Sequence, residues 1–272
     1  MNDPASARSP LELVAPLAVD EGLRPDGSRH VELYTMEGLL TFLWAGDPAA
    51  ENVVVCMGGA MGGLLGPART LYHELAELLP GEGVGVMRVG YRKPGDQTRC
   101  LIDVAAAAES AAKVGARRFV FLGHSFGGAV AIQAAVTMPE NSVGVATFAT
   151  QSAGCECAEE LGKTPLLMFH GTNDRILGPE NSHMVQMIAG RGDVRLLPGA
   201  DHLLVEAAAE GKDELMEKYF EEESLSDAEI VEGLKARIAR GELVPVLCGS
   251  AVMNVGVLPL MQAIIKFMPS PV

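Results

Sequence analysis

The sequence predicts an α/β fold, in which helices cover both faces of a mostly parallel sheet of eight strands. From about residue 28 onwards, short β-type runs alternate with longer helical runs, and this alternation is typical of such a sheet. Most of the β-type runs are almost continuously apolar, as expected for strands buried on both faces. The 272 residues suffice for one large domain and an appendage.

The expected elements follow one another in regular order. We place strands at residues 30–35, 39–46, 52–58, 83–91, 117–123, 143–150, 165–171 and 193–199. We place helices between them at residues 67–79, 98–114, 126–137 and 180–189. The first two strands alternate apolar and polar residues, which indicates an antiparallel edge, whereas the third to eighth are expected to be buried on both faces.

The character of the chain changes after about residue 203. A charged, helical stretch is followed by one strand-like run, "LVPVLCGSA", and one more helix. The predicted organisation is therefore an N-terminal extension over residues 1–27, an α/β domain over residues 28–222 and a mainly helical appendage over residues 223–272.

Composition excludes several classes of protein. A formal net charge of −14 argues against sequence-independent nucleic-acid binding, which needs clustered Lys and Arg. No apolar run is long enough to span a membrane, and the first residues lack the pattern of a signal peptide, so we expect a cytoplasmic protein. The five cysteines form no paired spacing, and we expect no disulfide framework, no metal and no organic cofactor.

The stretch "GHSFGG" at residues 123–128 carries the chemistry. Its first five residues fit G-x-S-x-G, the pattern of a sharp strand-to-helix turn that exposes the serine Oγ. The expected strand before it and the expected helix after it are the context that this pattern requires. We therefore predict that Ser125 is a catalytic nucleophile.

A serine needs a base to take its proton and an acid to orient that base. The chain order expected here is Ser, then Asp or Glu, then His. Asp174, in "HGTNDR", and His202, in "PGADH", both follow the carboxyl ends of expected parallel strands. We predict that Asp174 is the acid and His202 is the base.

Other polar residues compete for these roles. Asp96 comes before the serine in the chain, and Asp201 shares the turn of His202 and is expected to face solvent. His124 is expected to pack beside the elbow, and His170, which closes a strand, is expected to be a buried histidine with satisfied hydrogen bonds. The remaining histidines are expected at the surface; they are His30, His73 and His183.

Backbone donors must hold the oxyanion of the tetrahedral intermediate. We predict that the N–H of Phe126, directly after the nucleophile, is one donor. The second is expected in the Gly-rich loop "CMGGAMGG" at residues 56–63, where Gly59 is our choice and Ala60 the next. The triplet Gly-Lys-Thr in "LGKTP" is not a phosphate loop, because the first glycine of that motif is missing.

Residues 30–202 resemble the α/β-hydrolase superfamily. The stretches "GVMRVGYRKPGD", "GHSFGGAV", "FATQS", "HGTND" and "PGADH" are similar to those of its small dienelactone-hydrolase-like and esterase members. By position, the resemblance implies that Ser125, Asp174 and His202 form a catalytic triad. Dienelactone hydrolases proper have a cysteine where this chain has Ser125, so the serine implies ordinary ester hydrolysis.

Many relatives carry a lid after the sixth strand. Here "QSAGCECAEELGKT" is too short for a helical cap, which predicts an open pocket for small acyl groups. The expected function is a serine carboxylesterase whose partner is a small-molecule ester. Other acyl hydrolases (thioesterase, lactonase or amidase) and a non-catalytic, translation-factor-like binding module remain the alternatives.

Residues 205–271 resemble the end of the GTP-binding domain of elongation factor G. The resemblance rests on "DELMEKYFE" and "ELVPVLCGSA", in which "CGSA" matches the last guanine-contacting loop. The other GTPase motifs are missing, so no GTP binding is expected. Homodimer formation through this appendage is a hypothesis.

Overall fold

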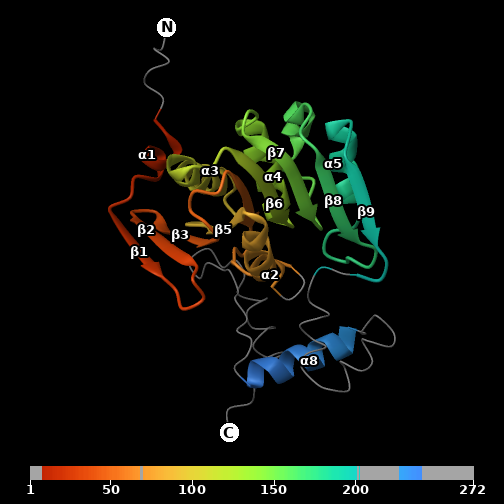
Figure 1. Ribbon diagram of the computed structural model, residues 1–272. Helices are drawn as coiled ribbons and strands as arrows, with labels where there is room; N and C mark the ends of the chain where they lie inside the picture. The colour runs from red at the N-terminus through yellow and green to blue at the C-terminus, as the bar shows by residue number, and fades with distance from the viewer. Residues whose placement is uncertain (1–7, 68–69, 201, 203–226, 241–272) are drawn as a thin grey trace. The chain divides into compact units, whose positions relative to one another are not determined.

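The structure is a computed structural model, and it describes residues 8–67, 70–200, 202 and 227–240 (Figure 1). The chain divides into two compact units, Met1–Pro198 and Gly199–Val272. The predicted boundary at residue 222 lies outside the described residues. The described part of the second unit contains one helix, α8 (Asp227–Ala239), within the stretch expected to be charged and helical.

The first unit is built on a mixed, mostly parallel sheet of nine strands. Its spatial order is β1-β2-β3-β5-β4-β6-β7-β8-β9. The antiparallel strands β1, β2 and β3 form one side, and β3 pairs antiparallel with β5; all later pairs are parallel. The strands are β1 Ala18–Leu23, β2 Arg29–Thr35, β3 Gly38–Ala45, β4 Asn52–Met57, β5 Val84–Gly90, β6 Arg118–His124, β7 Ser142–Phe148, β8 Leu166–Gly171 and β9 Asp193–Leu197.

This arrangement confirms the predicted fold class and the antiparallel edge, but the sheet has one strand more than the eight predicted. The additional strand, β1, lies within residues 1–27, which were expected to be an extension. Each residue of β1 is exposed, because the strand lies at the edge of the sheet. The sequence "AVDEGL" therefore lacks the apolar run by which a buried strand is detected.

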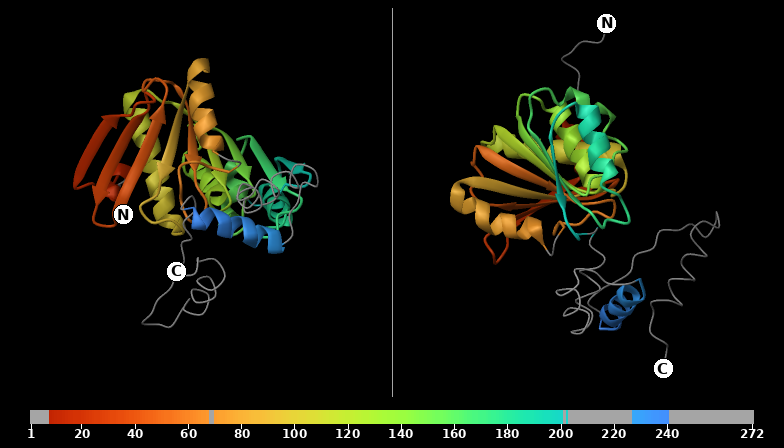
Figure 2. Two further views of the ribbon diagram at one scale, coloured as in Figure 1. Left: turned by 90° about the horizontal axis from the view of Figure 1, so that it is seen from below. Right: turned by 90° about the vertical axis from the view of Figure 1, so that its right-hand side faces the viewer.

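Helices cover both faces of the sheet (Figure 2). Helices α1, α3, α4 and α5 pack in a continuous series over one face, joined by a 3-10 helix, η3. Helix α2 packs on the opposite face, against residues of β4, β5 and β6. The bounds are α1 Pro10–Val14, α2 Leu71–Leu78, η2 Leu79–Glu82, α3 Gln97–Val114, α4 Phe126–Thr137, η3 Glu156–Leu161 and α5 Glu180–Ala189. Within the described residues, no helix has the length and apolar character that crossing a membrane requires.

The connection between β7 and β8 contains only the six-residue η3. No long helical insertion interrupts it, as its length in the sequence predicts.

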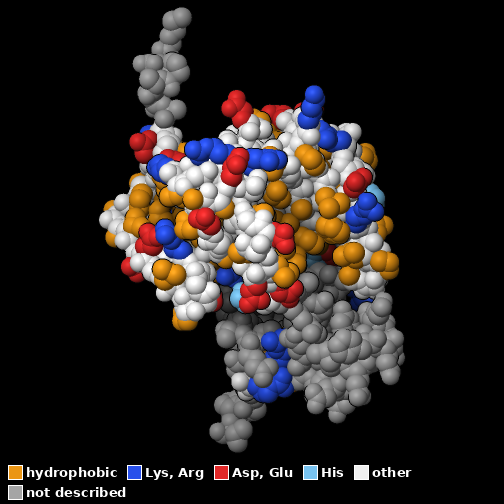
Figure 3. All heavy atoms as spheres, viewed as in Figure 1, with side chains coloured by type: hydrophobic (Ala, Val, Ile, Leu, Met, Phe, Trp, Pro, Cys, Tyr) orange, Lys and Arg blue, Asp and Glu red, His pale blue; other side chains and the backbone are white. Residues whose placement is uncertain are grey.

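Strand β9 differs from the expectation that the last strands are buried on both faces. Four of its residues are exposed, and Leu196 and Leu197 are 44% and 41% exposed. Apolar side chains gather over this edge of the sheet (Figure 3). The reason is that β9 is the last of the described strands in the sheet, with β8 beside it on one side.

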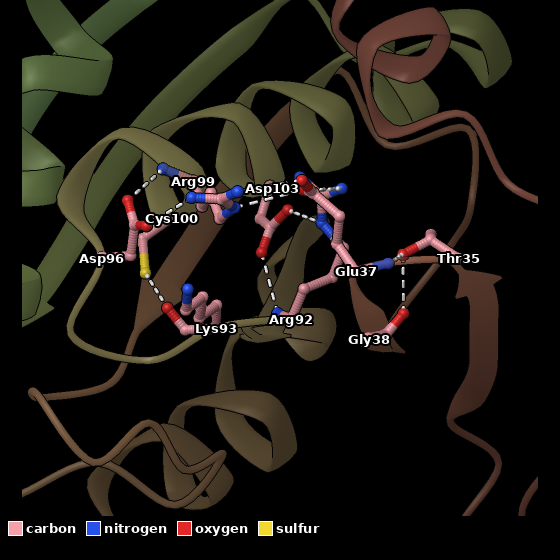
Figure 4. A network of polar contacts seen from close by, with 9 residues as sticks. All are labelled: Thr35, Glu37, Gly38, Arg92, Lys93, Asp96, Arg99, Cys100 and Asp103. Atoms are coloured by element: carbon pink, nitrogen blue, oxygen red, sulfur yellow. Dashed lines mark hydrogen bonds and ion pairs between the residues drawn. The ribbon is translucent and has the colours of Figure 1, made fainter. Parts of the chain in front are cut away.

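A buried ion pair fixes the loop after β5 to helix α3 (Figure 4). Asp103 of α3 accepts hydrogen bonds from the Arg92 backbone N–H, at 2.9 Å, and from its Nε, at 2.6 Å. The side chains of Arg92 and Asp103 are 2% and 0% exposed. Burial raises the pKa of Asp103, and its contacts with Arg92 oppose that rise.

Around this pair lies a more exposed set of charges. Glu37, in the β2–β3 turn, accepts hydrogen bonds from Arg99 at 2.9 and 3.2 Å and lies 3.5 Å from Nη1 of Arg92. Asp96 is the N-cap of α3 and also binds Arg99. The loop held in this way carries Pro94, and a methyl group built on Gly62 would lie 3.0 Å from Pro94 Cγ. The network therefore stabilises the loop that supports the Gly-rich segment after β4.

We predict that Arg92→Met lowers the free energy of unfolding by about 3–5 kcal/mol, because it leaves the buried Asp103 carboxylate without its cation. Arg99→Met is the matched control, and it should change stability little because its pairs are exposed. Urea unfolding followed by circular dichroism measures both. Equal effects of the two substitutions would contradict the assignment of the buried pair.

Candidate active site

Ser125 lies where β6 ends and α4 begins, as predicted. Its backbone has φ 55° and ψ −119°, a conformation that non-glycine residues rarely adopt. Its N–H donates to the Phe148 carbonyl at 2.8 Å, and its carbonyl accepts from Gly128 N–H at 3.0 Å. The side chain is half-buried. A strained serine between a strand and a helix is the geometry of a nucleophile elbow.

Small residues make this turn sterically feasible. A Cβ on Gly123 would overlap the Gly127 carbonyl, and one on Gly127 would overlap the carbonyls of Gly58 and Met57 at the end of β4. A Cβ on Gly128 would overlap the Thr150 side chain. The three glycines therefore allow α4 to start directly against the neighbouring backbone.

The Gly-rich loop after β4 lies beside the elbow, because β4 and β6 are adjacent parallel strands. A Cβ built on Gly59 would lie 3.7 Å from Ser125 Cβ. Gly62 N–H donates to the Gly59 carbonyl at 2.9 Å, which closes a tight turn. Gly59 therefore lies next to Ser125, and its role as an oxyanion donor remains a prediction.

Two tyrosines hold the start of this loop. Tyr72 donates its hydroxyl to the Met57 carbonyl at 2.8 Å, and Tyr91 donates to the Gly58 carbonyl at 3.4 Å. Tyr91 also packs edge-to-face against Phe126, with 6.4 Å between ring centroids. Phe126 is the first residue of α4, and N–H groups of a first helical turn have no acceptor within the helix. Its role as the other oxyanion donor remains a prediction.

Asp174 follows β8 and is 7% exposed. Its Oδ1 accepts hydrogen bonds from the backbone N–H groups of Ile176, at 2.9 Å, and Leu177, at 2.8 Å. The loop thus fixes the orientation of the carboxylate. Because β6, β7 and β8 are consecutive parallel strands, Ser125 and Asp174 follow carboxyl ends at the same edge of the sheet.

A second serine–histidine pair contacts Asp174 through its histidine. His170 Nδ1 is 2.7 Å from Ser182 Oγ, and His170 Nε2 is 2.7 Å from the Leu177 carbonyl and 3.4 Å from Asp174 Oδ2. Both His170 and Ser182 are fully buried. A nucleophile must meet its substrate, and Ser182 lies inside the packed face of α5. We therefore interpret this pair as structural support for the Asp174 loop.

His170 is thus the buried histidine with satisfied hydrogen bonds that the sequence predicts. Its contact with Asp174 was not predicted. Both residues lie in "HGTND", so a spacing of four residues across the end of a strand was the available signal.

His202 belongs to the second unit, and its role as the base remains a prediction. It follows β9 closely in the chain, and β9 is the neighbour of β8. Among the competitors, Asp96 is engaged as a helix cap, and His124 is buried beside the elbow, as expected. Asp201 lies outside the described residues.

Three further observations concern motifs outside the candidate triad. The Gly-Lys-Thr triplet leads into β8, and no helix follows it. Within the described part of the chain, no cluster of three or more His, Cys, Asp or Glu residues could hold a metal ion. The elongation-factor-like motifs "DELMEKYFE" and "ELVPVLCGSA" lie outside the described residues.

Solved structures share this architecture. The 2-hydroxy-6-oxo-6-phenylhexa-2,4-dienoate hydrolase of Rhodococcus sp. strain RHA1 matches with a TM-score of 0.50 and 16% identity, over 75% of this chain and 99% of that chain. Est1E of Butyrivibrio proteoclasticus matches with a TM-score of 0.51 and 15% identity, over 68% of this chain and 90% of that chain. No protein-family model matches the chain.

The strand order, the elbow at Ser125 and these likenesses define an α/β-hydrolase fold. At such identities the likeness concerns the fold and not the reaction.

We predict that Gly127→Ala lowers the free energy of unfolding by about 1–3 kcal/mol, because the methyl group overlaps the end of β4. Gly81→Ala is the control, since a Cβ there meets nothing within 4 Å. Thermal unfolding measured by calorimetry compares the two variants. A Gly127 variant as stable as the control would refute the close approach of α4 to β4.

Proposed function

We propose that the protein is a serine hydrolase, and specifically a carboxylesterase that acts on short-chain esters. The observation that carries the proposal is the strained Ser125, presented at the elbow with Gly59 beside it. Strain of this kind is kept where the surrounding structure enforces it, and in this fold it exposes a nucleophile.

The reaction follows from these residues. Ser125 Oγ attacks the ester carbonyl while His202 accepts its proton, and the N–H groups of Gly59 and Phe126 stabilise the oxyanion. The carbon–oxygen bond to the alcohol then breaks, and His202 returns the proton to the departing alcohol. Water, deprotonated by His202, then attacks the acyl-enzyme carbonyl; the bond from the acyl carbon to Ser125 Oγ breaks, His202 returns the proton to Oγ, and the carboxylic acid leaves.

Asp174 would orient His202 and stabilise its protonated form. Its Oδ1 is already held by two backbone N–H groups, which supports a fixed direction for the carboxylate. The short β7–β8 connection supports access for small acyl groups. A cytoplasmic location and a homodimer through residues 223–272 remain predictions from the sequence.

We predict that Ser125→Ala lowers kcat for p-nitrophenyl esters by on the order of 10⁴-fold or more, because it removes the nucleophile. Ser110→Ala is the matched control and should retain activity, because the Ser110 hydroxyl lies on α3 and binds the Ala106 carbonyl, outside the elbow and the Asp174 loop. Chain lengths from acetate to laurate should favour the short acids. Labelling by a fluorophosphonate probe, read by intact mass, should require Ser125.

The same panel separates the rival functions. Labelling at Ser125 without ester turnover, followed by turnover of thioesters, lactones or amides, would select another acyl hydrolase. Absence of labelling together with full ester activity in Ser125→Ala would reject the proposal. A guanine-nucleotide titration tests the translation-factor-like alternative, for which no binding is expected.

We also predict that Gly59→Ala lowers kcat/KM by about 10–100-fold, because its methyl group would stand over the reacting serine. The free energy of unfolding should change little, since the nearest atoms, at 3.5 and 3.7 Å, are at ordinary van der Waals distance. Steady-state kinetics and urea unfolding measure the two quantities on the same preparation. An unchanged kcat/KM would refute the assignment of Gly59 to the oxyanion hole.

A further inference from the structure

A second concave site lies away from the elbow, under helix α2. It is a cavity of about 400 Å³ between the β1–β2 turn, the end of β3, strand β5 and α2. None of its lining residues belongs to the elbow or to the loops after β4 and β8. The volume lies within the range of small-molecule sites in proteins.

Arg88 of β5 lines this cavity and is 5% exposed. Its Nε has no hydrogen-bond partner among the described residues. Burial lowers the pKa of Arg88, although an arginine keeps its charge in water at neutral pH. The Nε atom itself is sealed from water, so an anion in the cavity would meet the remaining donors of this buried guanidinium, a group suited to binding two oxygens.

The acidic residues around the cavity limit the charge of that anion. Asp26 accepts hydrogen bonds from the Ser28 N–H, at 2.9 Å, and from its hydroxyl, at 2.5 Å, and these bonds lower its pKa. Glu77 lies 3.5 Å from His73 Nε2, and its side chain is 68% exposed. Both carboxylates line the cavity, and Asp26 also lies near Arg24 and Arg88; the two carboxylates would repel a dianion more than a monoanion.

The rest of the lining is mixed, with an apolar part at Ala45, Ala76 and Pro80 and polar side chains at Ser28 and His73. One buried cation, an apolar part and two carboxylates together fit a monoanion with an apolar tail. A phosphate dianion would match the cation but neither the carboxylates nor the apolar part.

We propose that this cavity is a binding site for a small organic carboxylate, whose oxygens bind the guanidinium of Arg88 and whose apolar tail lies against Ala45, Ala76 and Pro80. The site is independent of the proposed hydrolase activity.

The test is a calorimetric titration of the full chain with butyrate, acetate and inorganic phosphate, each at the same ionic strength. Butyrate should bind most tightly, acetate more weakly and phosphate least. Arg88→Met should weaken butyrate binding by about tenfold or more, because the charged hydrogen bonds are lost. Arg118→Met is the matched control: it removes an exposed arginine outside the cavity and should bind butyrate as the unaltered chain does.

A second variant keeps the test independent of the folding of Arg88→Met. Ala76→Leu would place a larger side chain in the cavity from a helical position, and it should also abolish binding. Butyrate binding that survives both changes would place the ligand elsewhere, for instance at the elbow, and overturn the proposal. So would tighter binding of phosphate than of butyrate, or no binding of either carboxylate.

Discussion

The positive-φ backbone of Ser125 is the constraint on which the rest of the candidate site depends. A side chain at φ 55° is unfavourable by about 1–3 kcal/mol unless its surroundings enforce it. Here the enforcement comes from neighbouring backbone: the hydrogen bond to Phe148 on β7, and the contact of Gly127 with the end of β4. Strands on both sides of β6 thus hold the turn, so the sheet order and the elbow form one structural unit.

The loop after β8, which carries Asp174, is also held by hydrogen bonds to the backbone. Asp174 is fixed by two N–H groups of its own loop, and Leu177 of that loop is fixed in turn by His170. His170 is itself held by Ser182 of α5. Helix α5 therefore sets the position of the carboxylate through a buried histidine. A group that must orient a base gains from such support, because its direction is settled before substrate arrives.

The sequence predicts the features that depend on local pattern. Apolar–polar alternation locates strands β2 and β3, apolar runs locate β4 to β9, and G-x-S-x-G locates the elbow, because burial and turn geometry leave direct marks on residue type. Strand β1 leaves no such mark, since it is exposed and polar. The pairing of Arg92 with Asp103 and the support of Asp174 by His170 depend on side-chain directions at the ends of elements. Spacing alone does not determine those directions, and so neither contact was predicted.

Two buried arginines, Arg88 in β5 and Arg92 just after it, differ in how their charges are compensated. Arg92 is covered by the carboxylate of Asp103 at 2.6 Å, and its charge is balanced within the fold. Arg88 is equally buried, yet its Nε finds no hydrogen-bond partner in the described chain, and its side chain lines a cavity. Burying a cation without an anion is strongly unfavourable, so a fold keeps one only where something offsets it. For Arg92 the offset is a hydrogen-bonded carboxylate. For Arg88, Asp26 contributes without a hydrogen bond, and the cavity leaves room for a ligand to add to it.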